Sequence, residues 1–260
     1  MALFVQATDK PAGGTGVKMD APLLENGGYP ARLLRIVDLG EQPGSQQYPN
    51  PAYKMALVFE CLDEFMRDEE GKELEDQPRT FDYEVSYNLD GYMSEKSSIH
   101  KVMKALDGFG VGMDTLLGKP CTISLVQQAG KKDPTKFYNK VTGVTAMRAK
   151  DAERYGPLQL ESYIFNLDAS ATKEQFEKLS TRGGDYSQQN KIKGSLSLHK
   201  DAPQLAEVLG IEKHVVDLPD ADADVPAVSE ADILKQEADL EAAMGGAVAP
   251  AAEESDDPFA

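Results

Sequence analysis

The sequence predicts a mainly β protein with a small α/β addition and an acidic C-terminal tail. Five runs between residues 29 and 147 are rich in apolar and β-branched side chains, and loop-forming stretches separate them, which is typical of strands. One stretch among them has the spacing of an amphipathic helix. The segment from residue 201 to residue 260 is rich in acids, alanine and proline, which indicates a solvated tail.

The five runs have the patterning of half-buried strands. The third alternates Phe81, Tyr83, Val85 and Tyr87 on one side, and a period of two places these side chains on one face. Gly143 interrupts the fifth run and predicts a β-bulge. The expected strands are residues 29–40, 52–62, 79–88, 119–128 and 135–147.

A helix is expected over residues 94–108, between the third and fourth strands. Its apolar residues from Ile99 to Leu106 repeat at helical spacing, Ser94 can cap the start, and Gly108 can end it. Three strands, one helix and two strands form the element order of an OB-fold, a five-stranded Greek-key barrel. Such barrels bind oligonucleotides or oligosaccharides across strands two and three and the adjoining loops.

The chain is expected to divide into four parts. Residues 1–27 hold few apolar side chains and form a flexible N-terminal arm, and residues 28–150 form the barrel. Residues 151–215 form an elaboration packed on the barrel, with a strand at 161–168 and helices at 170–180 and 203–211. Residues 216–260 form an acidic tail that is mostly disordered.

Charge is unevenly distributed along the chain. Residues 201–260 hold 16 of the 44 acids and 2 of the 27 basic residues, so their net charge is −14 and that of residues 1–200 is −3. The overall acidity therefore says little about the body, where a basic surface remains possible.

Several classes of protein are not favoured by the sequence. No apolar run approaches the ~18–20 residues of a membrane span, and the first residues lack the pattern of a signal peptide. Cys61 and Cys121 are expected to be buried, reduced thiols of a cytosolic protein. The three histidines lack metal-ligand spacing, and no nucleophile–base motif or phosphate-binding loop occurs, so we expect no enzyme, no metal and no cofactor.

A binding role is better supported, by the segment from residue 131 to residue 150. It contains six basic residues and one acid, together with the adjacent aromatic residues Phe137 and Tyr138. Lysines attract phosphates, and exposed aromatic rings stack on unpaired bases at ~1–3 kcal/mol per base. Alternation favours Tyr138 for stacking and Phe137 for the core. In the alternative interpretation, which this segment supports equally, both rings pack in the barrel and the lysines are solvated.

Other cations and tyrosines are expected to join this segment along one groove. Arg32 and Arg35 lie on the first strand, Lys54 on the second, and two tyrosines flank the loop between them. Lys191 and Lys193 form a second basic group. The complete candidate set for binding DNA is Arg32, Arg35, Tyr48, Tyr53, Lys54, Lys131, Lys132, Lys136, Phe137, Tyr138, Lys140, Lys191 and Lys193.

The last eight residues, EESDDPFA, join four acids to Pro258 and Phe259. This resembles the tail tip of bacterial single-stranded DNA-binding proteins, although here Ala260 follows the Phe. The resemblance implies that the tail binds partner proteins and that its charges compete for the protein's own DNA groove. The implied partner-binding residues are Glu253, Glu254, Asp256, Asp257, Pro258 and Phe259.

The body resembles the OB-fold single-stranded DNA-binding proteins of tailed bacteriophages in the blocks YPARLLRIVDLGEQ, SEKSSIHKVMKAL, LLGKPCTISLV and FYNKVTGVTAM. This implies sequence-independent binding and protection of single-stranded DNA in phage replication, recombination and repair. Implied partners are a polymerase, helicase or recombinase, in the cytoplasm of the infected bacterium. The alternative is a protein-binding adaptor or accessory factor of a replication or virion complex, with no DNA binding of its own.

Overall fold

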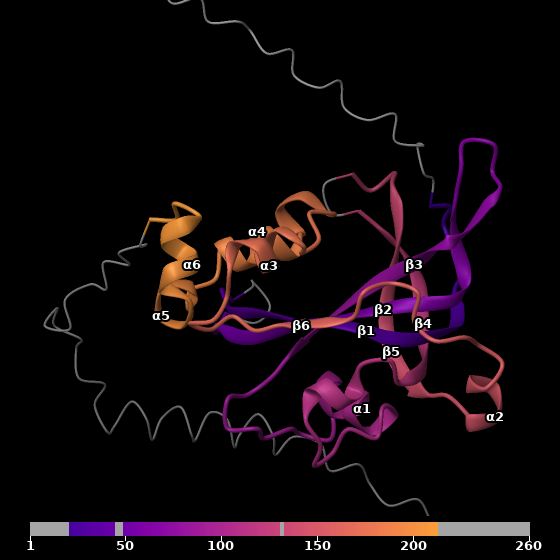
Figure 1. The fold of residues 1–260 in the computed structure, drawn as a ribbon, viewed down its shortest axis with the longest axis horizontal. Coiled ribbons are helices and arrows are strands. Elements are labelled where there is room, and N and C mark those ends of the chain that lie inside the picture. The colour runs from indigo at the N-terminus through magenta and orange to yellow at the C-terminus, as the bar shows by residue number, and fades with distance from the viewer. Residues whose placement is uncertain (1–20, 45–48, 131–132, 213–260) are drawn as a thin grey trace, which may run out of the picture. The chain divides into compact units, whose positions relative to one another are not determined.

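The computed structural model describes residues 21–44, 49–130 and 133–212 and shows a mainly β fold (Figure 1). The predicted fold class is confirmed at this level. Tyr48, Lys131, Lys132 and the acidic tail, with its six candidate partner-binding residues, lie outside the described residues. The same holds for residues 1–20 of the predicted N-terminal arm.

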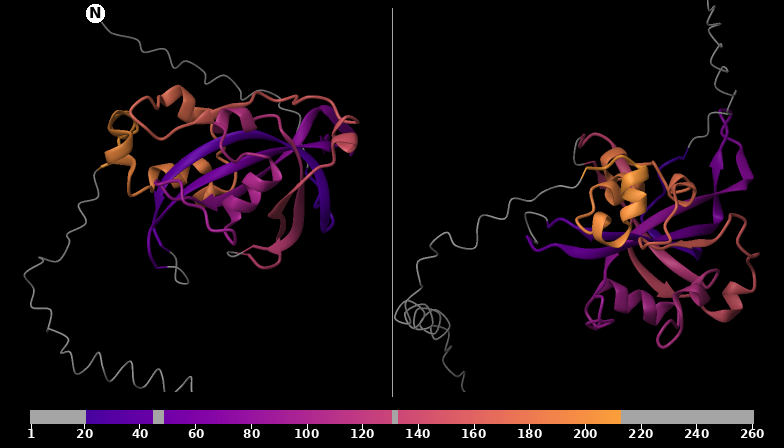
Figure 2. Two further views of the ribbon diagram at one scale, coloured as in Figure 1. Left: turned by 90° about the horizontal axis from the view of Figure 1, so that it is seen from below. Right: turned by 60° about the vertical axis from the view of Figure 1, so that its left-hand side comes forward.

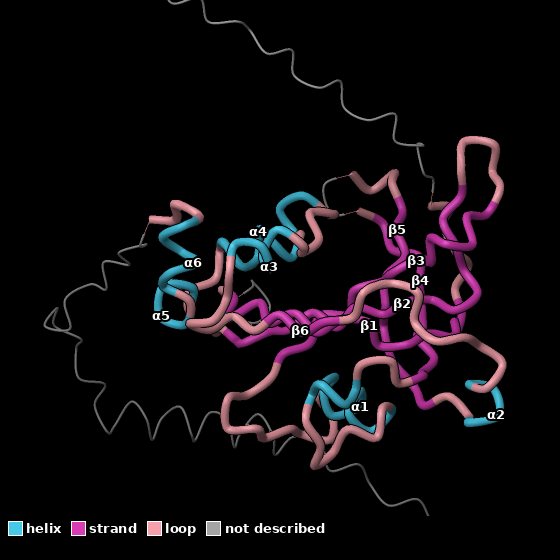
Figure 3. The backbone as a smooth tube through the Cα atoms, viewed as in Figure 1, coloured by secondary structure: helices cyan, strands magenta, loops and turns pink. Residues whose placement is uncertain are grey.

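Six strands form one sheet (Figure 3). Five of them pair antiparallel in the order β3–β2–β1–β4–β5, and the short β6 pairs parallel with β1. No ladder joins β3 to β5 among the described pairings, so the sheet is open at these two edges. The strands are β1 (Gly27–Gln42), β2 (Ala52–Arg67), β3 (Glu73–Ser86), β4 (Pro120–Ala129), β5 (Phe137–Ala146) and β6 (Tyr163–Phe165).

β1 is the central strand in the order of the five long strands. β2 follows one edge from Ala31 to Gln42, while β4 pairs with the other edge from Gly27 to Arg32. Pairing with β4 ends at Arg32, and farther along β1 the strand β6 pairs with Arg35–Val37. The residues that follow the five-strand unit are therefore attached to it through backbone hydrogen bonds as well as side chains.

Several predicted boundaries differ from the structure; for example, β2 continues to Arg67. β3 begins at Glu73 rather than Arg79, because backbone pairing with Met66 and Arg67 of β2 holds Leu74 and Glu73 in a ladder whatever the local sequence pattern. The helix α1 (Ser98–Ala105) starts later than expected. Its cap is Ser97, which accepts a hydrogen bond from the backbone N–H of His100 at 3.3 Å.

The fifth strand contains the expected bulge. Leu125 pairs with Val141 and Ser124 pairs with Gly143, so Thr142 is the extra residue, directly beside the predicted Gly143.

The larger core lies between the inner face of the sheet and α1. It contains residues from all five long strands, and both cysteines belong to it as buried free thiols. Burial raises the pKa of Cys121 to about 12 and that of Cys61 further. The face predicted from alternation is confirmed for the third strand, whose Val85 is buried in this core while Phe81, Tyr83 and Tyr87 pack against it.

A second core covers the opposite, outer face of β1. Val37 and Leu39 of β1 contact Phe165, Leu167 and the apolar sides of short helices that follow. In Figures 1 and 2 these helices gather on one side of the sheet, whereas α2 (Ala149–Ala152) lies apart from them. They are α3 (Lys173–Glu177), α4 (Gln188–Lys193), α5 (Leu198–Asp201) and α6 (Pro203–Val208).

Gly40 marks the closest approach between β1 and this C-terminal elaboration. Its φ of +69° follows a β-bulge between Asp38 and Gly40. A Cβ atom at this position would lie 2.4 Å from the hydroxyl oxygen of Ser195 and 2.6 Å from a methyl group of Leu167. Only glycine fits both the backbone conformation and the contact.

We expect Gly40→Ala to lower the free energy of unfolding by about 2–5 kcal/mol, because left-handed strain and overpacking act together. Gly71→Ala is the matched control: Gly71 has a φ of +83° but nothing within 4 Å of the added Cβ. It should cost only the strain, about 1–2 kcal/mol. Urea unfolding of the two variants measures the difference, and equal losses would show that the elaboration is not packed tightly at Gly40.

Candidate functional site

Arg32 and Arg35 lie on the outer face of β1 and are engaged within the protein. Arg32 donates from Nε to the carbonyl of Gly156 at 3.0 Å and from a terminal nitrogen to the carbonyl of Gly118 at 2.9 Å. Arg35 donates to the carbonyl of Glu161 at 3.1 Å, and its guanidinium lies 4.9 Å from the ring centre of Tyr163. Both arginines thus hold the segment that leads from β5 into β6.

Lys54 and Lys191 are also paired, through one carboxylate. Lys54 lies 3.1 Å from Glu84 on the neighbouring strand β3, and Lys191 of α4 donates to the other oxygen of Glu84. Burial alone would raise the pKa of Glu84, but hydrogen bonds and charge from both lysines outweigh it and lower the pKa. Lys193 lies 5.8 Å above the ring of Phe176.

The outer face of β1, β2 and β3 is therefore a docking surface for the elaboration. The Glu60 carboxylate on β2 accepts hydrogen bonds from the backbone N–H groups of Gln159 and Leu160 at 2.8 and 3.0 Å. The Asp82 carboxylate on β3 accepts a hydrogen bond from the side-chain amide of Gln188 at 2.7 Å. The structure does not bring the five cations of this face together with the residues of the β4–β5 hairpin in one groove.

Of the described candidate residues that are exposed, all but Lys193 of α4 lie at the tip of the β4–β5 hairpin. Lys136, Phe137, Tyr138 and Lys140, here called the hairpin site, are all exposed, with Phe137 at 56% and Tyr138 at 43%. Tyr138 and Lys140 pair with Gln128 and Val126 on the outer face of the hairpin. An exposed ring beside a lysine is suited to contact a base and a phosphate together.

The expectation that Phe137 joins the core is wrong. It shares the inner face of β5 with Val141, as alternation predicted, but it pairs with Ala129 at the last step of the ladder, beyond the end of the core. The next inward residue, Asn139, already hydrogen bonds with the backbone of Leu24 at 2.9 and 2.8 Å. Leu24 fills the end of the core, and Phe137 is left outside.

The hairpin is almost free of negative charge. Asp133 is the only acid between residues 120 and 147. It accepts hydrogen bonds from the hydroxyl and backbone N–H of Thr135 at 2.6 and 3.1 Å, which lower its pKa, and lies 3.5 Å from Lys136. The carboxylate is therefore used to shape the turn, and the lysines give the hairpin its net positive charge.

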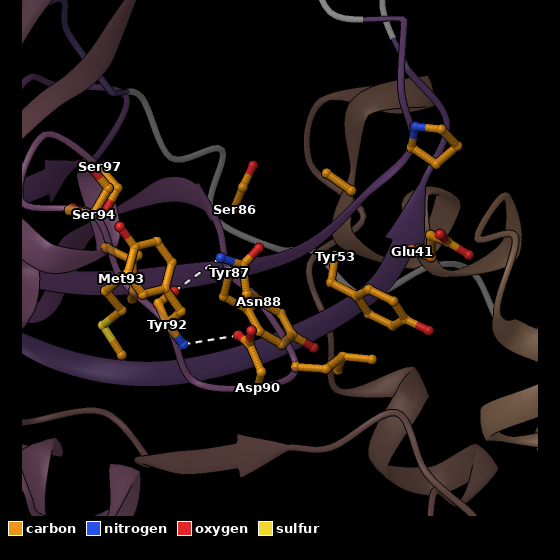
Figure 4. Close-up of a pocket in the computed structure, with 14 residues that line it drawn as sticks. Glu41, Tyr53, Ser86, Tyr87, Asn88, Asp90, Tyr92, Met93, Ser94 and Ser97 are labelled. Carbon is orange, nitrogen blue, oxygen red and sulfur yellow. Dashed lines mark hydrogen bonds between the residues drawn. The ribbon is translucent and has the colours of Figure 1, made fainter.

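A second exposed aromatic surface lies where β2 begins and β3 ends. Tyr53 and Tyr87 have ring centres 5.9 Å apart with planes tilted by 57°, and the ring of Tyr92 borders the same pocket (Figure 4). The volume is about 600 Å³. The residues that line this tyrosine pocket are Glu41, Pro51, Ala52, Tyr53, Ser86, Tyr87, Asn88, Leu89, Asp90, Tyr92, Met93, Ser94, Ser97 and Ile99.

The position of Tyr87 in this pocket is set by Asp38. The Tyr87 hydroxyl donates to the Asp38 carboxylate at 3.0 Å, and the same oxygen accepts the backbone N–H of Gly40 at 2.9 Å. Burial raises the pKa of Asp38, and these two hydrogen bonds offset part of the shift. The ring is thus held rigidly, and holding a ring in place lowers the entropic cost of stacking.

Sequence reasoning found Tyr53 but placed Tyr87 only on a strand face and did not single out Leu89 or Tyr92. The available signal was the stretch YNLDGY, in which a turn with Asp and Gly separates two tyrosines. In the structure the Asn88 side chain donates to the carbonyl of Tyr92 at 2.9 Å, and the Asp90 carboxylate accepts the backbone N–H of Tyr92 at 2.9 Å. The turn therefore brings Tyr92 back toward Tyr87 (Figure 4).

Within residues 21–44, 49–130 and 133–212, no three His, Cys, Asp or Glu side chains are grouped as a metal site would need. Over the same ranges, no helix has the length and apolarity to cross a membrane.

No model of a known protein family matches this chain. A search of curated proteins likewise finds no match. The function has to be inferred from the hairpin site and the tyrosine pocket themselves.

We expect Lys191→Ala to destabilise the protein by about 1 kcal/mol near neutral pH, because Glu84 loses a partner. The pKa of Glu84 is lowered in the folded state. Its ionised carboxylate therefore stabilises the fold fully above a pH of ~4.3, the pKa of glutamate in an unfolded chain, and this stabilisation is lost as the pH falls through the folded pKa. The stability difference from wild type should therefore shrink in acid. Urea unfolding near neutral pH and in acid measures the difference. The control is Lys191→Ala in a Glu84→Gln background, and a stability difference that does not change with pH would contradict the prediction.

Proposed function

We propose that this protein binds single-stranded DNA without sequence preference. The observation that carries the proposal is the hairpin site, where Phe137 and Tyr138 are exposed beside Lys136 and Lys140 on a hairpin almost without acids. Aromatic rings stack on any base, and lysines attract the phosphate backbone. This combination favours unpaired nucleic acid over a duplex, whose bases are not available for stacking.

We further propose that the five long strands form an OB-type barrel. The strand order β3–β2–β1–β4–β5, with α1 between β3 and β4, is the order that such a barrel has when it is opened between its third and fifth strands. Residues 22–26 span this opening: Arg79 of β3 donates to the carbonyl of Pro22 at 2.6 Å, and Asn139 of β5 bonds with Leu24. Backbone and side chains of this segment take the place of a direct ladder.

The barrel assignment gives the tyrosine pocket a role. In OB-folds the ligand crosses strands two and three and contacts the loops after strands one and four. The tyrosine pocket lies at the ends of β2 and β3, next to the β1–β2 loop, and the hairpin site is the β4–β5 loop with its flank. We propose that DNA bases stack at Tyr53, Tyr87 and Tyr92, and that the same DNA strand also binds at the hairpin site.

The proposed action is stoichiometric. Coating unpaired DNA blocks hairpins and nucleases, and the acidic tail competes for the same cations until DNA displaces it. Residues 253–259, with four acids and Phe259, are the proposed contact for a polymerase, helicase or recombinase. By its resemblance to phage proteins, the place of action would be the cytoplasm of an infected bacterium, in replication, recombination or repair.

A protein-binding adaptor is the second candidate, and the charge of the tyrosine pocket favours it. Glu41 and Asp90 line the pocket, and no lysine or arginine among the described residues does. Tyrosine faces and carboxylates together attract a lysine or arginine side chain, so a basic segment of a partner protein fits this surface. The two candidates are separated by direct measurement of DNA binding.

We expect Tyr138→Ala to weaken binding to oligo-dT by about 5- to 150-fold, because one stacked base is worth ~1–3 kcal/mol. Fluorescence anisotropy with a labelled oligonucleotide measures this. Tyr186→Ala is the matched control, since Tyr186 is 56% exposed but lies on the elaboration. If wild type fails to bind, or if both variants bind alike, the hairpin site is not a stacking site.

Removal of residues 217–260 should raise the affinity for oligo-dT, because an intramolecular polyanion no longer competes for the basic hairpin. The effect should be largest at low salt, where charge interactions are least screened. The same anisotropy assay at two salt concentrations tests this. Under the adaptor hypothesis neither form binds DNA, and removal of the tail changes nothing.

A further inference from the structure

The outer face of the β4–β5 hairpin continues beyond the hairpin site as an open strip. Thr142 and Thr145 are exposed, and a Cβ atom added at Gly143 would meet nothing within 4 Å. The opposite case is the outer face of β1–β3, which the elaboration covers. From Tyr138 to Ala146 the strip is about 25 Å long, at ~3.3 Å per residue.

The side chains along this strip are neutral hydrogen-bonding groups. The ladder pairs Thr122 with Thr145 and Ser124 with Gly143, and no carboxylate points outward from β4 or β5. The hydroxyls of Thr142 and Thr145 donate to the carbonyls of Ser124 and Thr122 at 3.3 and 3.4 Å, long bonds that a phosphate oxygen can replace by rotation of the hydroxyl. The two strands carry no negative side chain to repel a phosphate chain. Lys140 lies at one end of the strip and supplies a positive charge there.

The other end of the strip is a shallow cavity of about 280 Å³. It is lined by Arg148 and Tyr155 together with Thr122 of the strip, and Gly28 and Pro30 of β1 form its floor. The Arg148 side chain is 84% exposed. Asp151 also lines the cavity, but its carboxylate lies 2.6 Å from Nε of Arg148, which leaves the other guanidinium nitrogens free to bind a phosphate.

We propose that this strip is a second DNA subsite, which takes the backbone of single-stranded DNA onward from the hairpin site to Arg148 and Tyr155. The inference rests on the proposed function and extends it. Phosphates lie along Thr142, Thr145 and the strand backbone, and Arg148 binds the last of them with Tyr155 as a stacking ring. Short oligonucleotides that fill only the hairpin site do not reach this subsite, whereas longer ones do.

The test measures full-length protein against oligo-dT of two lengths by fluorescence anisotropy. The short probe has about 3 nucleotides, which at ~3.4 Å each cannot span the strip, and the long probe has about 30. Thr145→Glu places a negative charge on the strip and should weaken binding of the long probe by about fivefold or more, with the short probe unchanged. Thr145→Lys should tighten binding of the long probe and steepen its salt dependence by ~0.7 in log–log slope. Thr181→Glu and Thr181→Lys, at an exposed position on the elaboration, are the matched controls.

Arg148→Gln provides an independent variant at an exposed helix end, should position 145 not tolerate the change. It should reduce the salt slope of the long probe by ~0.7 and leave the short probe unchanged. If wild type binds neither probe, the proposed function fails. If wild type binds both but the Thr145 and Arg148 variants behave like the Thr181 controls, the second subsite is overturned while DNA binding at the hairpin site stands.

Discussion

The packing of residues 163–211 against the outer face of β1 is the contact on which the rest of the molecule depends. Val37 and Leu39, which would otherwise be exposed apolar side chains on the outer face of the sheet, are buried by Phe165 and Leu167. The left-handed Gly40 lets the two backbones approach, and β6 adds main-chain hydrogen bonds to the same strand. This contact covers one outer surface of the sheet and leaves that of β4–β5 open.

Charge is divided between these two surfaces. Carboxylates of Glu60 and Glu84 lie on the covered face, where backbone N–H groups and lysines satisfy them. Lys54 and Lys191 are held on the one carboxylate of Glu84 with side chains only 31% and 24% exposed, so they are less accessible to phosphate than fully exposed cations. The hairpin carries exposed lysines with one acid, so a chain with a net charge of −17 still presents a locally positive surface.

Much of the fold was accessible from sequence. The five long strands, the helix after the third and the inner face of β3 follow from periodicity, which reports which side of a strand is apolar. The first residues of β3 were not accessible, since ELEDQP has no strand pattern and its Glu73, Leu74 and Pro78 are held by pairing with β2. Tyr138 was correctly expected at the surface, whereas Phe137 was not, because periodicity gives the face of a strand but not where the core ends.

Sequence alone determined the element order, the identity of the aromatic and basic residues and the division between a nearly neutral body and an acidic tail. Only the tertiary structure decided which cations remain available. Arg32, Arg35, Lys54 and Lys191 look like the hairpin lysines in sequence, yet carbonyl groups, a tyrosine ring and Glu84 engage them. The reason is that a side chain's partners come from residues 30–130 positions away, and local patterning contains no information about them.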